Sequence, residues 1–308
     1  DDRGRKFGFE LTIFRYGVEQ PISGGSAWDI NDIYFAHFAL ADVSGHRFVY
    51  DDRAGRGALG EAGAATGDER AWVGDWRIGR DARGEFDIVA SDGGDALDLV
   101  LAPSKAATPN GRDGTFADGS CATCLARYYS FTRLAASGTL RVDGQAFRVR
   151  GTAWHDHEWG AQSIEPGLAG WDWFSIQLDD GIDVMLYRLR ARDGSTLAQS
   201  SGTFVDAAGG HRVLPLAAFS IAPLGWWASP RDGTRYPSGW TVDVPASGIK
   251  LTVTPMLADQ ELDTAHSTQV IYWEGAVSVR GVVDGHAVTG VGYTELTGYA
   301  NGGAGDVR

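Results

Sequence analysis

The sequence predicts an all-β protein built from antiparallel strands. Apolar and polar residues alternate along most of the chain, whereas the 3.6-residue period of an amphipathic helix is nearly absent. The chain contains 43 glycines, and Asp-Gly or related turn pairs separate many of the alternating runs. With 43% hydrophobic residues in 308, it can form one large β domain or two ordinary ones. So many consecutive hairpins favour sheets that close to protect their edges.

The first predicted strand covers residues 7–14 and places Phe7, Phe9, Leu11 and Ile13 on one face. Residues 128–158 are expected to form three strands, with breaks at 136–138 and 142–144. Other strands are expected at 33–43, 72–78, 86–90, 97–101, 171–178 and 182–189, and other turns at 179–181, 192–194, 208–210, 246–248 and 283–285.

Three stretches are interpreted as irregular. Residues 102–123 are rich in turn formers and predict a long loop. Residues 161–170 read as a connector, so we expect one β domain over residues 1–165 and a second over 166–308. Residues 55–60 match G-x-G-x-x-G, but no βαβ pattern surrounds them, and we interpret them as a loop.

Charge and composition narrow the choice of partners. The net charge of −13 and the pI of about 4.9 argue against nucleic acid or an anionic membrane surface. The sequence contains no run of about 18 apolar residues, so we expect no integral membrane segment. Residues 1–6 do not resemble a signal peptide. The only cysteines, Cys121 and Cys124, cannot complete a four-ligand zinc site alone, so we expect a loop disulfide or two thiols.

Residues 151–160 carry the densest functional chemistry in the chain. On an extended strand, His155, His157 and Trp159 share one face with Ala153. Trp154, Asp156 and Glu158 share the other. A second aromatic and acidic run follows at residues 171–174, Trp-Asp-Trp-Phe. Our hypothesis is that the two runs meet in a pocket.

Asp172 is the candidate general acid of this pocket. A carboxyl group in an apolar barrel has a raised pKa, which suits proton donation near neutral pH. The alternative is an ordinary ion pair with Arg188 or Arg190. Tyr128, Tyr293 and the other aromatic residues fit either a core or the lining of a hydrophobic ligand site.

His155 and His157 also suggest a metal site. A metal would need a third ligand such as His37, His266 or a carboxylate. Without one, the imidazoles are acid–base groups or structural hydrogen-bond donors. The expectation is that the protein uses neither a metal nor another cofactor.

The sequence resembles the family that joins carotenoid 1,2-hydratases (hydroxyneurosporene synthases) to the AttH-like proteins called predicted secreted hydrolases, and it looks closer to the AttH-like branch. The resemblance spans nearly the whole chain. It is carried by residues 7–15 (FGFELTIFR), 34–40 (YFAHFAL), 153–160 (AWHDHEWG), 170–178 (GWDWFSIQL), 259–261 (DQE), 272–275 (YWEG) and 292–299 (GYTELTGY).

This resemblance implies two packed lipocalin-like β-barrel or sandwich domains. It also implies a periplasmic or secreted location. The hydratases add water across an isolated double bond of an isoprenoid without a cofactor, and the residues proposed to matter there match His157, Trp159 and Asp172. Family members usually carry a Glu-Trp-Trp-Tyr-type stretch ahead of the first strand, which is missing here, so we expect the first barrel to lack a strand or to receive one.

The leading hypothesis is therefore a cofactor-independent hydratase or hydrolase acting on an apolar, isoprenoid- or polyketide-like substrate. His157, Asp172, His155 and Glu158 are its candidate catalytic residues. The candidate substrate-binding residues are Trp154, Trp159, Trp171, Trp173, Tyr128 and Tyr293. The alternatives are a lipid- or terpenoid-binding protein without catalysis, and a metal-dependent enzyme using His155 and His157.

Overall fold

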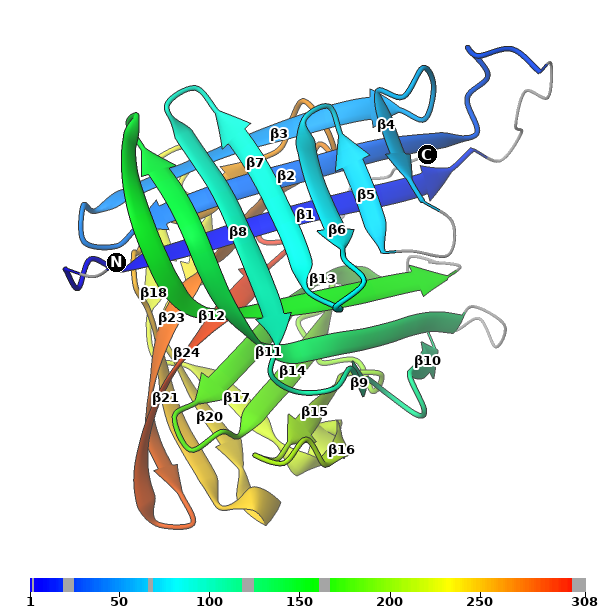
Figure 1. Ribbon diagram of the computed structural model, residues 1–308. Coiled ribbons are helices and arrows are strands. Elements are labelled where there is room, and N and C mark those ends of the chain that lie inside the picture. Colours follow the sequence, from blue (N-terminus) through cyan, green and yellow to red (C-terminus); the bar gives the residue numbers. More distant parts are fainter. Residues whose placement is uncertain (2, 19–24, 66–68, 118–124, 161–166, 301–308) are drawn as a thin grey trace. The chain divides into compact units, whose positions relative to one another are not determined.

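A computed structural model describes residues 1, 3–18, 25–65, 69–117, 125–160 and 167–300 of the protein. Within these ranges the chain forms 24 β-strands, two short 3₁₀ helices and no α-helix, which confirms the all-β prediction (Figure 1). None of the helices in the described ranges has the length and apolar character needed to cross a membrane.

Two compact units make up the protein. Unit 1 contains residues 1–103, 135–153 and 263–269, and unit 2 contains residues 104–134, 154–262 and 270–308. The division falls inside strands β11 and β12, which therefore contribute residues to both units. The boundary expected between residues 165 and 166 lies outside the described residues and stays a prediction.

A three-stranded antiparallel sheet of unit 1 contains β1 (Phe7–Gly17), β2 (Asp32–Asp42) and β3 (Arg47–Arg56) in that order. The predicted alternation of residues 7–14 and 33–43 does produce strands here. Phe38 and Leu40 of β2 are each only 1% exposed and form part of the core. Gly55 lies within β3, so the G-x-G-x-x-G match begins in a strand rather than wholly in a loop.

A nine-stranded sheet follows in the sequence. Its strand order is β10-β11-β8-β7-β6-β5-β4, and β9 and β12 also pair with β11. The bounds are β4 Ala62–Ala64, β5 Arg70–Val73, β6 Trp76–Arg80, β7 Phe86–Asp92, β8 Asp95–Pro103, β9 Thr108–Pro109, β10 Thr115–Ala117, β11 Leu125–Val142 and β12 Gln145–Gly160.

Two expectations about this part of the chain were wrong in detail. The strand expected at 72–78 is a hairpin, because Gly74 turns the chain at φ +61° between β5 and β6. The loop expected over 102–123 contains the short strands β9 and β10. Its last residues, including Cys121 and Cys124, lie outside the described residues.

The break expected at residues 136–138 is also absent, and β11 runs through it. Gly138 is needed there for close contact rather than for a turn. A Cβ atom at this position would lie 2.2 Å from the backbone oxygen of Asp98 on β8. The turn expected at 142–144 is present, with Asp143 and Gly144 both at positive φ.

The large sheet of unit 2 has ten strands in the order β16-β15-β14-β13-β24-β23-β21-β20-β17, with β22 paired to β23. Its core includes the fully buried Trp240, Phe174 and Ile176. The bounds are β13 Leu168–Leu178, β14 Asp183–Ala191, β15 Ser201–Val205, β16 His211–Pro215, β17 Ser220–Pro223, β20 Trp240–Val244, β21 Ile249–Pro255, β22 Glu261–Asp263, β23 Ile271–Val283 and β24 His286–Leu296. A separate hairpin pairs β18 (Trp226–Ala228) with β19 (Arg235–Pro237), and the 3₁₀ helices cover Leu216–Ala218 and Pro245–Ser247.

Candidate functional site

The residues of β12 that belong to unit 2 use both faces of the strand, as the sequence predicted. On the first face, the ring centroids of His157 and Trp159 are 5.0 Å apart. The ring of His157 also packs at a tilt against Tyr129 of β11, with ring centroids 5.2 Å apart, and a 3.0 Å hydrogen bond joins His157 Nδ1 and Tyr129 Oη. The ring centroids of His155 and Phe131 lie 6.2 Å apart on the same face. We call His155, His157, Trp159, Tyr129 and Phe131 the imidazole face.

The opposite face carries Trp154 and Asp156. Both Ser130 Oγ and Trp154 Nε1 donate hydrogen bonds to Asp156 Oδ1, the latter at 2.8 Å. Trp154 packs edge-on against Trp173 of β13, with ring centroids 6.2 Å apart. Trp173 Nε1 in turn donates a 3.2 Å hydrogen bond to Tyr128 Oη. The structure therefore brings the two predicted aromatic runs together through this face.

Glu295 of β24 completes the group on this side. It pairs directly with Trp173 in the β13–β24 register, and its Oε2 accepts a 3.1 Å hydrogen bond from Trp171 Nε1. We call Trp154, Asp156, Tyr128, Ser130, Trp171, Trp173 and Glu295 the carboxyl face. Tyr293, two residues before Glu295 on β24, shares the sheet face of Glu295 because side chains alternate along a strand.

The two carboxyl groups of this face have raised pKa values. Burial, together with the negative charge of Asp156, raises the pKa of Glu295 to about 7, although the Trp171 hydrogen bond opposes the shift. Crowding by protein atoms also raises the pKa of Asp156, against the hydrogen bonds from Ser130 and Trp154. Asp156 is nevertheless an exposed residue, so water can reach this carboxyl group.

A third carboxyl group lies next to Glu295. Glu274 of β23 stands directly opposite Glu295 in the β23–β24 register. Side chains opposite each other on neighbouring strands have Cβ atoms about 5 Å apart, and like charges in such a pair are destabilising.

Asp172 lies on the other face of β13 from Trp171 and Trp173. It is fully buried, and its Oδ2 accepts hydrogen bonds from Arg188 while its Oδ1 accepts from Arg190 and Tyr299 at 2.9 Å each. The ion pair left open as the alternative for Asp172 is therefore present with both arginines. Since the guanidinium groups can only donate, Asp172 is held as an acceptor, and the structure does not place it among the residues of the carboxyl face.

The remaining predicted residues have clear positions. Glu158 is exposed on β12, and Trp159 is 45% exposed, so the end of this strand is accessible. His37 and His266 belong to unit 1, where His37 Nε2 lies 3.1 Å from Ser267 Oγ and His266 Nδ1 lies 3.3 Å from Asp52. Across the described ranges, no group of three or more His, Cys, Asp or Glu side chains is arranged to hold a metal ion.

Sequence reasoning missed Glu295, Asp156, Tyr129 and Ser130 as site residues. Asp156 was placed on the correct face of its strand but was given no role. Glu295 lies in the run 292–299, whose alternation sets it in phase with Tyr293. That phase was the only available signal, because the pairing with Trp173 joins strands more than 100 residues apart.

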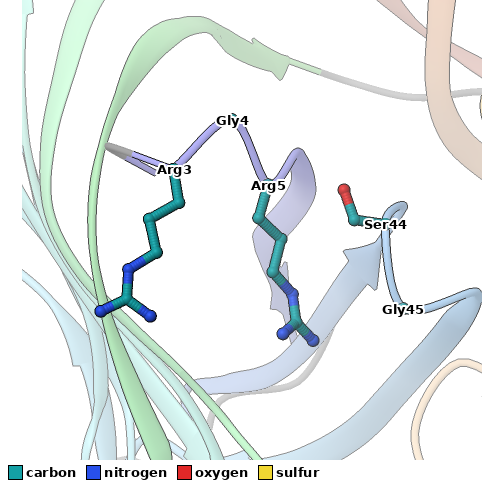
Figure 2. A pocket seen from close by; sticks show the side chains of 5 residues that line it. All are labelled: Arg3, Gly4, Arg5, Ser44 and Gly45. Atoms are coloured by element: carbon teal, nitrogen blue, oxygen red, sulfur yellow. The ribbon is translucent and has the colours of Figure 1, made fainter.

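Two hollows lined by described residues lie in unit 1, and no residue of the imidazole face or the carboxyl face lines either of them. One, of about 320 Å³, is lined by Arg3, Arg5 and Ser44 and their glycine neighbours near the amino end (Figure 2). Arg5 pairs with Asp42 beside it. The other, of about 520 Å³, runs along β3.

Comparison with solved structures identifies the fold of the protein. The fold is all-β and lipocalin-like, and it is shared with kievitone hydratase from Nectria haematococca at a TM-score of 0.71 and 17% identity, over 95% of this chain and 85% of that one. CghA in complex with Sch210972 matches at a TM-score of 0.50 and 14% identity, over 87% of this chain and 85% of CghA. At these identities the matches establish the fold alone.

Closer similarity identifies the family. The sequence model of the AttH-like family matches residues 1–299. The crystal structure of an AttH protein from Nitrosomonas europaea matches at a TM-score of 0.84 and 32% identity, over 97% of this chain and 89% of that chain. The protein belongs to the AttH-like family. No curated protein matches the chain.

Proposed function

We propose that this protein is a cofactor-independent enzyme that adds water to, or removes water from, an apolar isoprenoid- or polyketide-like substrate at the carboxyl face. One observation carries the proposal. Asp156 and Glu295, two carboxyl groups with raised pKa values, lie among the aromatic side chains of Trp154, Trp171 and Trp173. The lipocalin-like fold shared with a protein named as a hydratase is consistent with it.

Glu295 takes the role of general acid that the sequence had given to Asp172. A pKa of about 7 leaves a large fraction of Glu295 protonated at neutral pH, which suits proton donation. The Trp171 indole fixes the orientation of the carboxyl group through Oε2. Asp172, held by Arg188 and Arg190, instead stabilises the fold.

The reaction balances in both directions. Glu295 transfers its proton to one carbon of the substrate double bond, and the electron pair of that bond forms the new C–H bond, leaving a carbocation on the other carbon. The faces of the tryptophan rings stabilise this positive charge. Water attacks the cation and releases a proton to Asp156, and proton transfer from Asp156 to Glu295 restores the enzyme. Dehydration is the same sequence reversed.

The imidazole face supports a second candidate reaction. Tyr129 and His157 form a hydrogen-bonded pair beside the accessible Trp159. A neutral imidazole in this position could activate water to hydrolyse an ester or lactone. His155 lies on the same face of the strand and would assist there, whereas Glu158 lies on the opposite face.

The test is oxygen incorporation from ¹⁸O-labelled water into a panel of terpenoids that end in an isopropylidene group, followed by mass spectrometry. Wild-type protein should transfer one labelled oxygen atom to at least one substrate, and Glu295→Gln should reduce turnover at least 100-fold. Asp172→Asn is unsuitable as a control because it removes a buried charge. His157→Gln is the matched variant, since it acts only on the imidazole face and should leave hydration intact.

Each outcome supports a different function or a different position of the active site. Loss of turnover in Glu295→Gln alone supports the carboxyl face. Loss in His157→Gln alone transfers the chemistry to the imidazole face. Retention of a hydrophobic ligand by every variant, without turnover in any of them or in the wild type, leaves a binding protein and ends the enzyme proposal.

A further inference from the structure

Asp52 of β3 differs from the other buried aspartates of the protein. Five aspartates are buried among the described residues. Four of them form ion pairs: Asp42 with Arg5, Asp95 with Arg47, Asp172 with Arg188 and Arg190, and Asp183 with Lys105 and Arg133. Asp52 has no lysine or arginine partner in these ranges, although its side chain is only 4% exposed.

Hydrogen bonds do not compensate the buried charge of Asp52 either. Its Oδ1 meets only His266 Nδ1, at a long 3.3 Å and from a side chain that is 88% exposed. Its Oδ2 is buried and accepts no hydrogen bond from any described residue. A buried carboxylate normally has a cation or several donors, because removing its charge from water is costly. The fold supplies neither at Asp52.

The neighbouring histidine and arginine side chains of unit 1 do not neutralise the charge of Asp52. His37 stands opposite Asp52 in the β2–β3 register, but burial lowers the pKa of His37 to about 4, so it is neutral at neutral pH. Arg53 is engaged with Asp75, with Asp51 and with the carbonyl oxygen of Ser91. Arg47 is engaged with Asp95 and Asp143.

Asp52 lines the hollow of about 520 Å³ along β3, a volume that suits a small organic ligand. Four further carboxylates line it, Asp51, Asp92, Asp95 and Asp263, together with Arg47, which pairs with Asp95. Burial and the negative charges of Asp92 and Asp52 raise the pKa of Asp51, which shows that these groups repel one another. The hollow therefore has a negative potential that a cation would relieve.

Aromatic rings form another part of the wall. Phe48 and Tyr50 project from the same side of β3 as Asp52, and their ring centroids lie 6.1 Å apart. Aromatic faces beside carboxylates are suited to organic cations, because the rings contact the alkyl part and attract the positive charge. A bare divalent ion would not use these rings.

We propose that this hollow binds an aliphatic amine in its ammonium form, with the ammonium group donating hydrogen bonds to Asp52. The aliphatic chain packs on Phe48 and Tyr50, and a second ammonium group, where present, faces another of the carboxylates that line the hollow. The site lies in unit 1, and binding there does not depend on the reaction proposed for unit 2.

The test measures binding of 1,4-diaminobutane to the full chain by isothermal titration calorimetry at neutral pH and fixed ionic strength. Butylamine is the single-charge probe, butanol is the neutral probe, and calcium chloride is the inorganic cation. We expect the diamine to bind, butylamine to bind more weakly, and butanol not to bind. Asp52→Asn should weaken diamine binding at least tenfold. Asp87→Asn, which alters an exposed carboxylate paired with Arg77, should leave it unchanged.

Thermal unfolding without ligand gives an independent readout. Removing an uncompensated buried charge should leave the melting temperature of Asp52→Asn equal to or above that of the wild type. A variant that melts lower or fails to fold would show that Asp52 is already compensated, and would overturn the proposal. Equal heats from calcium chloride and the diamine, or equal diamine binding by Asp52→Asn and the wild type, would also overturn it.

Discussion

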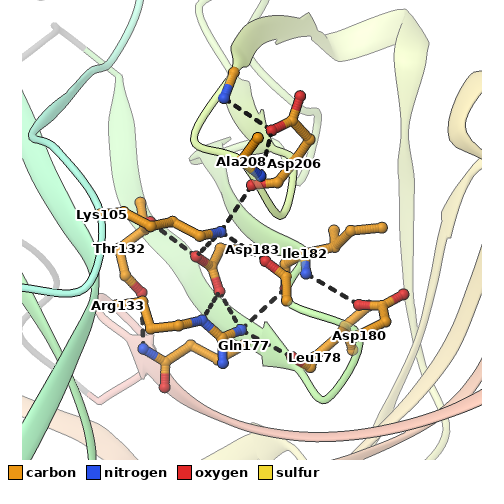
Figure 3. Close-up of polar contacts among 12 residues, drawn as sticks. Lys105, Thr132, Arg133, Gln177, Leu178, Asp180, Ile182, Asp183, Asp206 and Ala208 are labelled. Atoms are coloured by element: carbon orange, nitrogen blue, oxygen red, sulfur yellow. Dashed lines mark hydrogen bonds and ion pairs between the residues drawn. The ribbon is translucent and has the colours of Figure 1, made fainter.

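The buried carboxylate of Asp183 allows the sharpest test of what stabilises unit 2. Its side chain is fully buried at the start of β14, and Lys105, whose side chain is 6% exposed, donates to its Oδ2 at 2.7 Å (Figure 3). Arg133 donates to Oδ1 at 2.6 Å, and Thr132 donates to Oδ2 at 2.9 Å. Lys105 also donates to the carbonyl oxygens of Gly181 and Asp206. The network therefore joins residues 104–134 to the β13–β14 hairpin.

Replacing Asp183 by Asn should cost about 3–5 kcal/mol of the free energy of unfolding, which is the usual cost of removing one partner from a buried ion pair. Lys105 would keep its charge in a site where only carbonyl oxygens remain to receive it. The amide group of Asn would also place a donor against one of the present donors. At roughly 2–4 °C per kcal/mol for a chain of this size, the melting temperature should fall by about 10 °C.

Urea unfolding followed by tryptophan fluorescence measures this cost. Asp87→Asn is the matched control, because Asp87 and Arg77 form a half-exposed ion pair that should contribute less than about 1 kcal/mol. In the Lys105→Met background, Asp183→Asn should cost less than in the wild type, since the uncompensated lysine is gone. A cost below about 1 kcal/mol for Asp183→Asn alone would refute the reasoning.

Three further outcomes are expected. Because Glu295 must be protonated to act as an acid and its pKa is raised to about 7, turnover should fall as the pH rises through about 7 in a pH–rate profile, and a flat profile would exclude it. Burial lowers the pKa of His37 to about 4 from an unfolded value near 6.5, so stability should fall by up to about 3 kcal/mol as the pH drops through that interval, and His37→Gln should remove this part of the pH dependence in urea titrations. Gly138→Ala should destabilise unit 1 by about 2–4 kcal/mol because its Cβ would clash with the Asp98 carbonyl oxygen, whereas Gly151→Ala, with open space around it, should have little effect in the same measurement.

Local alternation was sufficient to predict most strands and the faces of β12. His157 and Asp156 lie on opposite sides of β12, as a period of two requires, and the contacts with Tyr129 and Ser130 follow from the same period on β11. Turn chemistry was reliable where a glycine follows Asp, as at Gly144. These features depend only on neighbours in the sequence.

Features that depend on distant strands were not predictable. Gly138 looked like a turn residue, yet its role is to let β11 approach the backbone of β8. Asp172 was predicted from the sequence to be the acid, and Glu295 was given no role. Only the fold shows that β14 brings two arginines to Asp172, while β24 places Glu295 opposite Trp173. No local pattern carries this information.

Asp172 and Glu295 lie on opposite faces of the sheet at β13, and the surroundings on each face explain why one carboxyl group stabilises the fold and the other is proposed to donate a proton. Asp172 and Trp173 are adjacent on β13, so their side chains point to opposite faces of the sheet. On the Asp172 face, two guanidinium groups and a phenol provide every hydrogen bond that a carboxylate needs. On the Trp173 face, Glu295 is surrounded by protein, receives one indole N–H and lies near Asp156, so its pKa is raised and it is the group that keeps a proton. The position of the proposed proton donor follows from this difference in surroundings rather than from the residue type.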